Sequence, residues 1–395
     1  MSRRLIVLGA TGSIGASALD VAAELGERIE VVGLSCNGSW RDLAALAARW
    51  RPAAVAIADE GAWREARASG AFGEGVRLLA GASGLVELAA GGEADIVLNG
   101  IVGAAGLEAT LAALGGGRRV ALANKESLVV GGELVAAALG GRILERGMLL
   151  PVDSEHNAIW QLLAGKRTDE VRRIVLTASG GPFRHTPAEA LARVTPAEAL
   201  AHPTWDMGPK ITVDSATLAN KGLEVIEAHH LFGLPYERID VVVHPQSIVH
   251  GLVEWTDGAL FAELGAPDMR APIRTALAWP DRAIGPSAVA LAELSGLTFE
   301  APDLDRFPAL ALARAAGQAG GTAPAVFNAA NEVAVALFLE GAVGFPDIAA
   351  LCGRVLDRHS PRPVDSLATL MEADRWAREE TGSLGGRRPS AATRP

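Results

Sequence analysis

Residues 3–25 read RRLIVLGATGSIGASALDVAAEL, and this stretch decides the fold of the first part of the chain. Residues 4–8 form a short apolar run that is typical of a buried parallel strand. The glycine turn Gly9–Gly15 and a helical pattern follow, and the next strand is predicted at residues 30–34. In this context glycines let the backbone approach a pyrophosphate, while the helix N-terminus offers free N–H groups. The stretch therefore predicts a nucleotide-binding domain.

The residues after the second predicted strand bear on the choice of nucleotide. Residues 35–41 read SCNGSWR and contain no carboxylate. A carboxylate at this point would hold the ribose 2′-hydroxyl of NAD and repel a 2′-phosphate. Its absence, with Arg41 nearby, favours NADP. Arg41 is equally compatible with a solvated position on a helix.

Further strand–helix units continue to about residue 150. Strands are predicted at residues 54–57, 95–98 and 119–122, and helices at 61–69, 106–114 and 132–139. This alternation predicts a doubly wound parallel sheet, in which ligands lie beyond the carboxyl ends of the strands. The segment Asn124-Lys125-Glu126 follows one such strand, and we expect it to face the cofactor.

Two carboxylates follow the strand predicted at residues 148–150, namely Asp153 and Glu155. In an extended segment residues two apart point the same way, so both carboxylates would meet at one place and require a cation or a proton. Oxygen ligands favour Mg²⁺ or Mn²⁺. The alternative is a helix N-terminus, with Asp153 or Ser154 as the capping residue.

A third carboxylate, Glu224, lies four residues after Asn220 and three after Lys221. On a helix the three side chains would share a face. The alternative is an ordinary surface Lys–Glu pair of little energetic value. An amide and an ammonium group beside a carboxylate also suit a phosphorylated substrate held next to a metal.

An anion site is also predicted after the strand at residues 173–176. There Ser179-Gly180-Gly181 offers a hydroxyl and backbone N–H groups, although such a tripeptide is also common in plain turns.

Residues 183–212 are polar and contain proline, and they form a candidate lid around His202. We expect structural roles for the adjacent His229 and His230, and local hydrogen bonds for His244 and His250.

Composition excludes several classes of protein. The 395 residues predict two or three domains, and 36 basic against 46 acidic residues give a net charge of -10, a poor match for nucleic acid. The longest stretch without Asp, Glu, Lys or Arg, residues 315–331, contains proline and asparagine and does not suit a membrane span. The first apolar run is too short for a signal peptide, and Cys36 and Cys352 cannot form a disulfide framework. We expect a cytoplasmic location.

Nine motifs in this order resemble the 1-deoxy-D-xylulose 5-phosphate reductoisomerase family. They are GATGSIG, GIVGAAGL, ANKESLV, LPVDSEHNAI, ASGGPFR, HPTWDMGPKITVDSATLANKGLEVIEA, HPQSIVHG, LGAPDMRAPI and NAANEVAV, and they extend from residue 9 to about residue 335. The long central motif is highly specific.

The resemblance implies roles for individual residues. The implied NADPH contacts are Thr11, Gly12, Ser13, Ile14, Asn37, Ser39, Asn124, Glu126 and Gly208. The implied metal ligands are Asp153, Glu155 and Glu224, and the implied catalytic residues are Lys125, Glu155 and His202. The implied substrate contacts are Lys125, Ser154, Glu155, Ser179, His202, Ser215, Asn220, Lys221 and Glu224, with Trp205 and Met207 in the lid. One departure is that Ser39 replaces the usual asparagine and the basic residue beside it is missing, so Arg41 would have to compensate.

The implied reaction rearranges 1-deoxy-D-xylulose 5-phosphate and reduces the product to 2-C-methyl-D-erythritol 4-phosphate, with NADPH and Mg²⁺, Mn²⁺ or Co²⁺. The implied protein is a homodimer of three-domain chains: a Rossmann-like domain (1–150), a catalytic α+β domain (151–285) with a lid (about 183–212), a linker (286–310) and a C-terminal helical domain (311–380). Residues 381–395 are predicted to be a disordered tail. The rival functions are another NADP-dependent dehydrogenase, of the semialdehyde or homoserine type, and a nucleotide sensor without catalysis.

Overall fold

The computed structural model describes residues 2–92, 94–141, 143–144, 147–205, 207–285 and 289–386. The chain divides into two compact units. The first unit comprises residues 1–127, 135–157 and 268–287, and the second comprises residues 128–134, 158–267 and 288–395. Helix α6 contributes to both units, and its backbone is kinked at Gly131.

The first unit contains a seven-stranded sheet in the order β4-β3-β2-β1-β5-β6-β7, and all its strand pairs are parallel. Its strands are β1 (Arg3–Leu8), β2 (Ile29–Cys36), β3 (Ala54–Ile57), β4 (Arg77–Ala80), β5 (Ile96–Asn99), β6 (Arg119–Leu122) and β7 (Leu149–Pro151). The central strands are continuous apolar runs because helices cover both faces of such a sheet. The predicted doubly wound fold is confirmed, with its switch point between β1 and β5.

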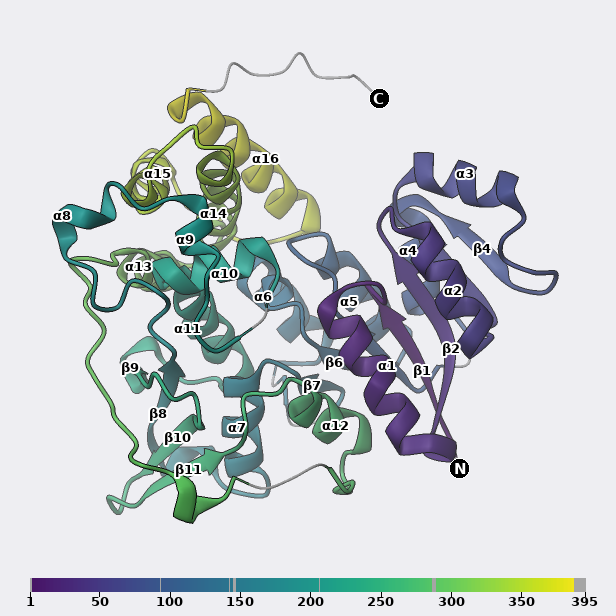
Figure 1. Cartoon of the computed structure of the whole chain (residues 1–395), viewed down its shortest axis with the longest axis horizontal. Coiled ribbons are helices and arrows are strands. Elements are labelled where there is room, and N and C mark those ends of the chain that lie inside the picture. The colour runs from purple at the N-terminus through teal and green to yellow at the C-terminus, as the bar shows by residue number, and fades with distance from the viewer. Residues whose placement is uncertain are drawn as a thin grey trace. The chain divides into compact units, whose positions relative to one another are not determined.

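The helices of the first unit follow the predicted alternation (Figure 1). They are α1 (Ser13–Leu25), α2 (Trp40–Trp50), α3 (Glu60–Ser69), α4 (Gly81–Ala90), α5 (Gly106–Gly115), α6 (Glu126–Ala138) and α12 (Arg270–Ala278), with the short η1 (Gly26–Arg28). Helix α7 (Ser154–Leu163) begins in the first unit and continues in the second. Helix α12 packs against α1, where Arg274 pairs with Glu24. Arg3 and Arg119 donate hydrogen bonds to the carbonyl oxygens of Leu277 and Trp279 at the end of α12.

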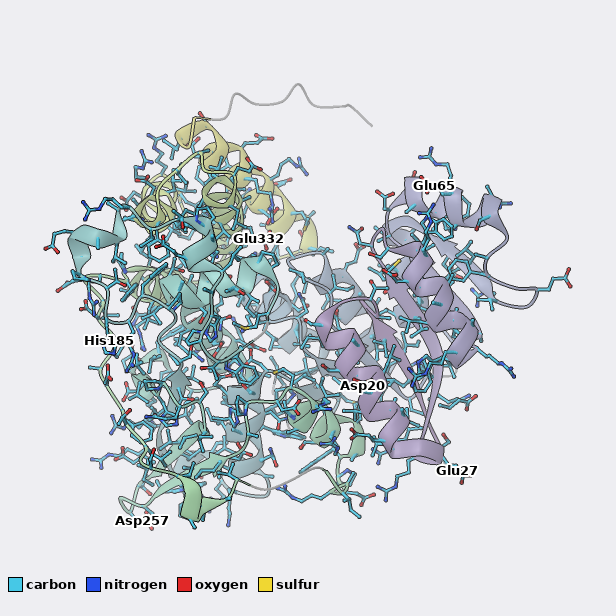
Figure 2. All side chains as sticks on the ribbon, in the orientation of Figure 1. Asp20, Glu27, Glu65, His185, Asp257 and Glu332 are labelled. Carbon is cyan, nitrogen blue, oxygen red and sulfur yellow. The ribbon has the colours of Figure 1, made fainter. Side chains whose placement is uncertain are left out.

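The second unit contains a mixed four-stranded sheet in the order β11-β10-β8-β9. Its strands are β8 (Val171–Ala178), β9 (Ile239–Val243), β10 (Val249–Trp255) and β11 (Leu260–Leu264). β8 and β9 are parallel, while β10 is antiparallel to both β8 and β11. Asp257 lies at the turn between β10 and β11 (Figure 2). β11 is an edge strand, and Leu260, Phe261 and Leu264 are exposed on it.

Helices form the rest of the second unit, and those from residue 309 onward gather at the end away from β10 and β11 (Figure 1). They are η2 (Thr168–Glu170), α8 (Ala188–Leu191), α9 (Pro196–Ala199), α10 (Pro209–Thr217), α11 (Ala219–Phe232), η3 (Tyr236–Arg238), η4 (Leu291–Glu293), α13 (Ala309–Ala319), α14 (Ala323–Leu339), α15 (Phe345–Asp357) and α16 (Leu367–Leu384). The core helix is α14, and its Phe327 and Phe338 are fully buried.

The compact units differ from the predicted domains in two respects. The sequence places residues 268–285 in the catalytic domain, but α12 groups with the first unit because it packs on α1. The C-terminal helices, predicted as a separate domain, group with the central residues because α14 packs on α10 and α11. The described residues contain no helix with the length and apolar character that a membrane span requires.

Three local features also bear on the sequence predictions. Helix α16 continues to Leu384, past residue 381 where the predicted tail begins, and residues 387–395 of that tail lie outside the described residues. Strand β4 is not predicted, because it is an edge strand that begins with an exposed arginine and is only partly buried. For the segment after β7 the sequence leaves an extended chain and a helix N-terminus open, and the structure has the helix, because Ser154 already begins α7. The N–H of Asn157 donates to the carbonyl of Asp153, as in the first turn of a helix.

Candidate active site

The glycine loop after β1 lies at the switch point of the first sheet, where the chain must turn tightly into α1. Gly9 has a φ of 77°, and a Cβ on it would lie 2.8 Å from the carbonyl oxygen of Gly100. A Cβ on Gly15 would lie 2.3 Å from the carbonyl oxygen of Gly9. Gly12 and Ser13 are exposed at the start of α1, whose first turn contains no acidic residue. The loop therefore presents a helix N-terminus that suits a pyrophosphate.

A buried polar network braces the neighbouring loop after β5. The amide of Asn124 donates to the carbonyl oxygens of Ile101 (2.8 Å) and Gly103 (2.9 Å) and to the Glu126 carboxylate (2.9 Å). Asn99 donates to Thr110 (2.9 Å), whose hydroxyl lies 3.0 Å from that of Ser127. The sequence analysis missed Asn99, Thr110 and Ser127, because their partners lie up to 17 residues away on other elements.

The end of β2 carries the two residues that depart from the family pattern, and both Asn37 and Ser39 are exposed there. The Arg41 guanidinium stacks over the Trp40 ring, 4.2 Å from its centroid, and lies 3.8 Å from the Glu65 carboxylate. Its side chain is 74% exposed, so this ion pair with α3 is weak. Arg41 is on the surface, and this position is compatible with both alternatives, a solvated side chain and one that binds the 2′-phosphate.

The first two candidate metal ligands lie at the start of α7. Asp153 accepts an ion pair from Lys125, with 2.7 Å between Nζ and Oδ2, and its Oδ1 lies 3.6 Å from His156 Nδ1. The Ser154 hydroxyl donates to Glu155 at 2.6 Å. The Lys125 and Asp153 side chains are only 7% and 11% exposed. Within the first unit, the structure therefore brings Lys125, Asp153, Ser154 and Glu155 together.

The third candidate ligand, Glu224, is buried on α11. Asn220 donates to its Oε1 at 2.5 Å, and Lys221 forms an ion pair with its Oε2. These are the predicted i,i+4 and i,i+3 pairs. Because Lys221 and Glu224 are both almost fully buried, this is not the exposed surface pair of the alternative interpretation.

Two serines and a histidine converge at the carboxyl end of β8. His202 Nε2 lies 2.9 Å from Ser179 Oγ and 3.2 Å from Ser215 Oγ, and the two hydroxyls lie 3.4 Å apart. We call these three residues the hydroxyl–imidazole cluster. Its groups are half-buried in the second unit and can all donate to an anion.

The tautomer of His202 follows from its backbone partners. Its Nδ1 accepts hydrogen bonds from the backbone N–H groups of Thr204 (3.1 Å) and Trp205 (2.9 Å). The neutral ring therefore carries its proton on Nε2, which faces the two serines. Burial lowers the pKa of His202 below its ordinary value of 6.5. The imidazole thus orients Thr204 and Trp205 within the candidate lid and offers one N–H to the cluster.

The glycines after Ser179 allow α10 to approach the cluster. Gly180 and Gly181 have φ values of 83° and 64°. A Cβ on Gly181 would lie 2.8 Å from Ala216 Cα and 3.0 Å from the carbonyl oxygen of Ser215. Ser179-Gly180-Gly181 is therefore a left-handed turn packed against α10, and not an open loop.

The predicted lid, about residues 183–212, contains α8 and α9 and extends into the first turn of α10. The Thr212 hydroxyl donates to the Gly208 carbonyl at 2.9 Å, which ties the end of this segment to α10. The Trp205 ring lies 6.4 Å from that of His250, centroid to centroid. Met207 lies in the same segment, half-buried.

Three other histidines, outside the hydroxyl–imidazole cluster, have partners in the protein. His229 Nδ1 lies 2.7 Å from the Leu234 carbonyl and its ring stacks on Tyr236, while His230 packs against Gly132. His244 is satisfied by the Thr298 carbonyl and the Ile248 N–H. These contacts agree with the structural roles predicted for His229 and His230, while His244 has one local hydrogen bond, as predicted, and one to a residue 54 positions away.

The architecture and the polar groups define a dinucleotide-binding α/β protein whose second unit carries the hydroxyl–imidazole cluster. Family models match the chain over three segments: 1-deoxy-D-xylulose 5-phosphate reductoisomerase at residues 5–132, its C-terminal domain at 149–232, and the DXP reductoisomerase C-terminal domain at 264–380. The chain belongs to the 1-deoxy-D-xylulose 5-phosphate reductoisomerase family.

Relatives of that name are similar over nearly the whole chain. The protein of Chlorobium chlorochromatii is 53% identical over 382 residues, which cover 95% of this chain and 98% of the relative. That of Xanthomonas euvesicatoria is 54% identical over 385 residues and 96% of each chain. The solved Zymomonas mobilis enzyme in complex with NADPH is 46% identical, with a TM-score of 0.89 over 98% of this chain and 100% of that one. A DOX-P reductoisomerase in complex with NADPH, fosmidomycin and magnesium is 38% identical, with a TM-score of 0.90 over 98% and 100%.

Proposed function

We propose that the chain catalyses the NADPH- and divalent-metal-dependent rearrangement and reduction of 1-deoxy-D-xylulose 5-phosphate to 2-C-methyl-D-erythritol 4-phosphate, in the non-mevalonate isoprenoid pathway. The observation that carries this proposal is the hydroxyl–imidazole cluster, which offers three converging donors to a phosphate in a chain of this family. A nucleotide sensor without catalysis would need neither this second anion site nor the buried carboxylates.

The residues proposed to hold the metal are Asp153, Glu155 and Glu224. Their donor set fits a hard cation, because all the donors are carboxylate oxygens. Lys125 lies beside Asp153, and Asn220 and Lys221 lie beside Glu224, so each of these two carboxylates has polar partners within its own unit. Mg²⁺, Mn²⁺ or Co²⁺ would act here as a Lewis acid that stabilises negative charge developing on the substrate oxygens.

The substrate phosphate is assigned to the second unit. Ser179 and Ser215 offer hydroxyl groups and His202 offers its Nε2 proton, with Asn220 and Lys221 following on α11. A phosphate held by these groups is remote from the bond that changes, so its binding energy can be used to order the substrate and the lid. Trp205 and Met207, within the lid proposed at about residues 183–212, would cover the substrate and exclude water.

Proton transfer is assigned to the first unit. Lys125 holds a proton on Nζ in its ion pair with Asp153, and Glu155 accepts a hydrogen bond from the substrate contact Ser154. Lys125 and Glu155 are therefore proposed catalytic residues, and His202 of the second unit is the third. NADPH would supply the hydride. Its proposed contacts are Thr11, Gly12, Ser13, Ile14, Asn37, Ser39, Asn124, Glu126 and Gly208, with Arg41 as the candidate for the 2′-phosphate.

The proposal includes a homodimer in the cytoplasm. Strand β11 supports the dimer, because Leu260 and Phe261 are 57% and 47% exposed on an edge strand that can pair with a second chain. Sedimentation should give twice the chain mass of 40.8 kDa. Two buried free thiols, Cys36 and Cys352, support a reducing compartment.

One assay tests the reaction. Protein, NADPH and 1-deoxy-D-xylulose 5-phosphate are mixed with and without Mg²⁺ or Mn²⁺, and loss of nicotinamide absorbance should require both metal and substrate. Glu224→Gln should lower kcat/KM at least about hundredfold, because a neutral amide is a poor ligand for a hard cation. The matched control is Glu237→Gln, an exposed carboxylate on η3 that should leave turnover unchanged. Metal-independent loss of NADPH, or full turnover by Glu224→Gln at saturating metal, would contradict the assignment.

A further inference from the structure

The motif NAANE on α14 contains a buried asparagine, Asn331, that the proposed reaction does not use. Asn331 is fully buried in a helix whose other described side chains are mostly apolar. A buried amide is costly unless it is hydrogen-bonded. Asn328, three residues earlier, donates from its Nδ2 to Glu332 within α14 at 3.0 Å. Asn331 instead reaches out of its own helix.

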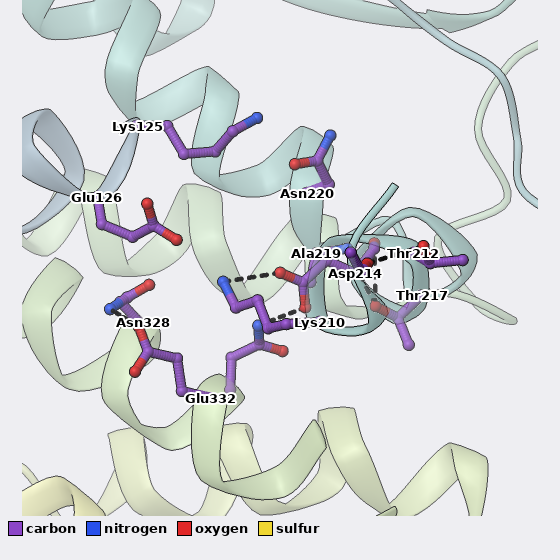
Figure 3. Close-up of polar contacts among 12 residues, drawn as sticks. Lys125, Glu126, Lys210, Thr212, Asp214, Thr217, Ala219, Asn220, Asn328 and Glu332 are labelled. Atoms are coloured by element: carbon purple, nitrogen blue, oxygen red, sulfur yellow. Dashed lines mark hydrogen bonds and ion pairs between the residues drawn. The ribbon is translucent and has the colours of Figure 1, made fainter. Parts of the chain in front are cut away.

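The partner of Asn331 is Asp214, 117 residues earlier on α10. Asn331 Nδ2 donates to Asp214 Oδ1 at 2.7 Å, and Lys210 forms an ion pair with Asp214 Oδ2 at 2.8 Å (Figure 3). The Asp214 side chain is only 1% exposed. A carboxylate this deeply buried needs such partners, because it has lost its hydration. The contact therefore fixes one face of α10 against α14.

Asp214 immediately precedes Ser215 of the hydroxyl–imidazole cluster. Consecutive residues of an α-helix point about 100° apart, so the rotation that turns Asp214 toward α14 also determines where Ser215 points. The adjoining packing leaves little room for error, because Gly181 lacks the Cβ that would otherwise lie 2.8 Å from Ala216 Cα. At the start of α10, Thr212 holds the end of the lid through the Gly208 carbonyl. Helix α10 thus carries the contact with Asn331, the hydroxyl of Ser215 and the attachment of the lid.

We propose that Asn331 is a positioning residue, which through Asp214 sets the rotation of α10 and hence the phosphate-binding geometry of Ser215. The inference rests on the proposed function in one respect, namely that Ser215 binds the substrate phosphate. It assigns a role in substrate binding to the C-terminal helices, although no residue of theirs belongs to the cluster.

Steady-state kinetics of Asn331→Leu test the proposal. The leucine keeps a similar volume and removes the donor, so Asp214 loses a hydrogen bond and α10 is free to shift. The KM for 1-deoxy-D-xylulose 5-phosphate should rise about tenfold, the effect of about one lost hydrogen bond to a charged group. The kcat should change by less than about threefold, and the Kd for NADPH should stay unchanged, because the glycine loop belongs to the first unit.

A matched control separates positioning from stability. Asp374→Asn alters another buried carboxylate of the C-terminal helices, which pairs with Arg378 on α16 and is remote in sequence from the cluster. It should lower Tm and leave the KM unchanged. A KM of Asn331→Leu equal to wild type, with a lowered Tm, would overturn the proposal. An inactive wild-type protein would instead contradict the proposed reaction, so the two failures are distinguishable.

If Asn331→Leu does not fold, exchanging the amide and the carboxylate of the Asn331–Asp214 pair provides a second test. Asn331→Asp places two carboxylates in contact and should raise the KM. Adding Asp214→Asn restores an amide–carboxylate hydrogen bond in the reverse sense, and the double variant should have a lower KM than either single variant. Additive effects of the two substitutions on the KM would show that the residues do not act through each other and would overturn the proposal.

Discussion

The glycine loop of the first unit and the hydroxyl–imidazole cluster of the second are both suited to phosphate, but they are built in opposite ways. The loop is seven consecutive residues, Gly9–Gly15, and its donors are backbone N–H groups at the start of α1. The cluster takes Ser179, His202 and Ser215 from three segments spread over 36 residues, and its donors are side chains. The first depends on local backbone geometry and the second on packing between elements.

This difference predicts which substitutions should damage each site. A backbone site should be destroyed by any side chain that prevents the close approach of the loop. A side-chain site should be weakened in proportion to the displacement of the element that carries a donor. The two sites should also fail independently, because they belong to different compact units.

The largest effect is expected from Gly15→Ala in the glycine loop. The added Cβ would lie 2.3 Å from the Gly9 carbonyl oxygen and 2.5 Å from Ala10 Cα, and both are backbone atoms that cannot turn aside. The loop must open, so the Kd for NADPH should rise at least about hundredfold, equivalent to about 3 kcal/mol. Fluorescence titration with NADPH measures this change.

Gly115→Ala is the matched control for that substitution. Gly115 is a helical glycine at the end of α5, and a Cβ there meets no atom within 4 Å. Alanine should be neutral or slightly stabilising at such a position. Near-normal NADPH binding by Gly15→Ala would show that the loop tolerates a side chain and would contradict the contrast drawn between the glycine loop and the cluster.

A smaller effect is expected from Gly181→Ala beside the cluster. Alanine is strained at a φ of 64°, and its Cβ would press on Ala216 Cα at 2.8 Å and push Ser215 away from Ser179. The KM for 1-deoxy-D-xylulose 5-phosphate should rise about thirtyfold, while the Kd for NADPH stays unchanged. Steady-state kinetics and NADPH titration on the same preparation measure both.

Gly233→Ala provides a close control, because Gly233 has the same φ of 64° at the end of α11, but a Cβ on it would meet no atom within 4 Å. It should lower Tm through backbone strain and leave the KM unchanged. If the two alanine variants raised the KM equally, strain alone would account for the effect and the close packing of α10 would be irrelevant.

The same contrast explains how much the sequence could predict. The glycine loop and the pairs of Glu224 with Asn220 and Lys221 are predicted correctly, because their spacing within one turn or one helix determines which residues meet. The Asn331–Asp214 contact could not be predicted, because 117 residues separate its partners and either residue alone is typical of a helix cap or a surface.

The start of α7 illustrates a local choice that the sequence leaves open. In an extended Asp153-Ser154-Glu155, alternation would bring the two carboxylates to one side. The same residue types also favour a helix N-terminus, where carboxylates interact well with the helix dipole. Periodicity cannot separate these structures over three residues, and the tertiary contact of Asp153 with Lys125 lies outside any local pattern.

The smallest effect is expected from pH, and it should appear only in the side-chain site. His202 Nδ1 accepts hydrogen bonds from two backbone N–H groups, and protonation of Nδ1 would place a donor facing these two donors. Because burial lowers its pKa below 6.5, the neutral ring is the form that the native structure favours. Its contribution is complete above pH 6.5 and is lost as the pH falls through the lowered pKa. The KM should therefore rise about threefold at acidic pH, while the Kd for NADPH changes little.

Two variants test this acid limb, that is, the rise of the KM at acidic pH. His202→Gln should remove the acid limb, whereas His185→Gln, at an exposed position (Figure 2), should retain it. An acid limb that persists in His202→Gln would assign the titration to another group and leave the cluster, like the glycine loop, independent of pH in this range.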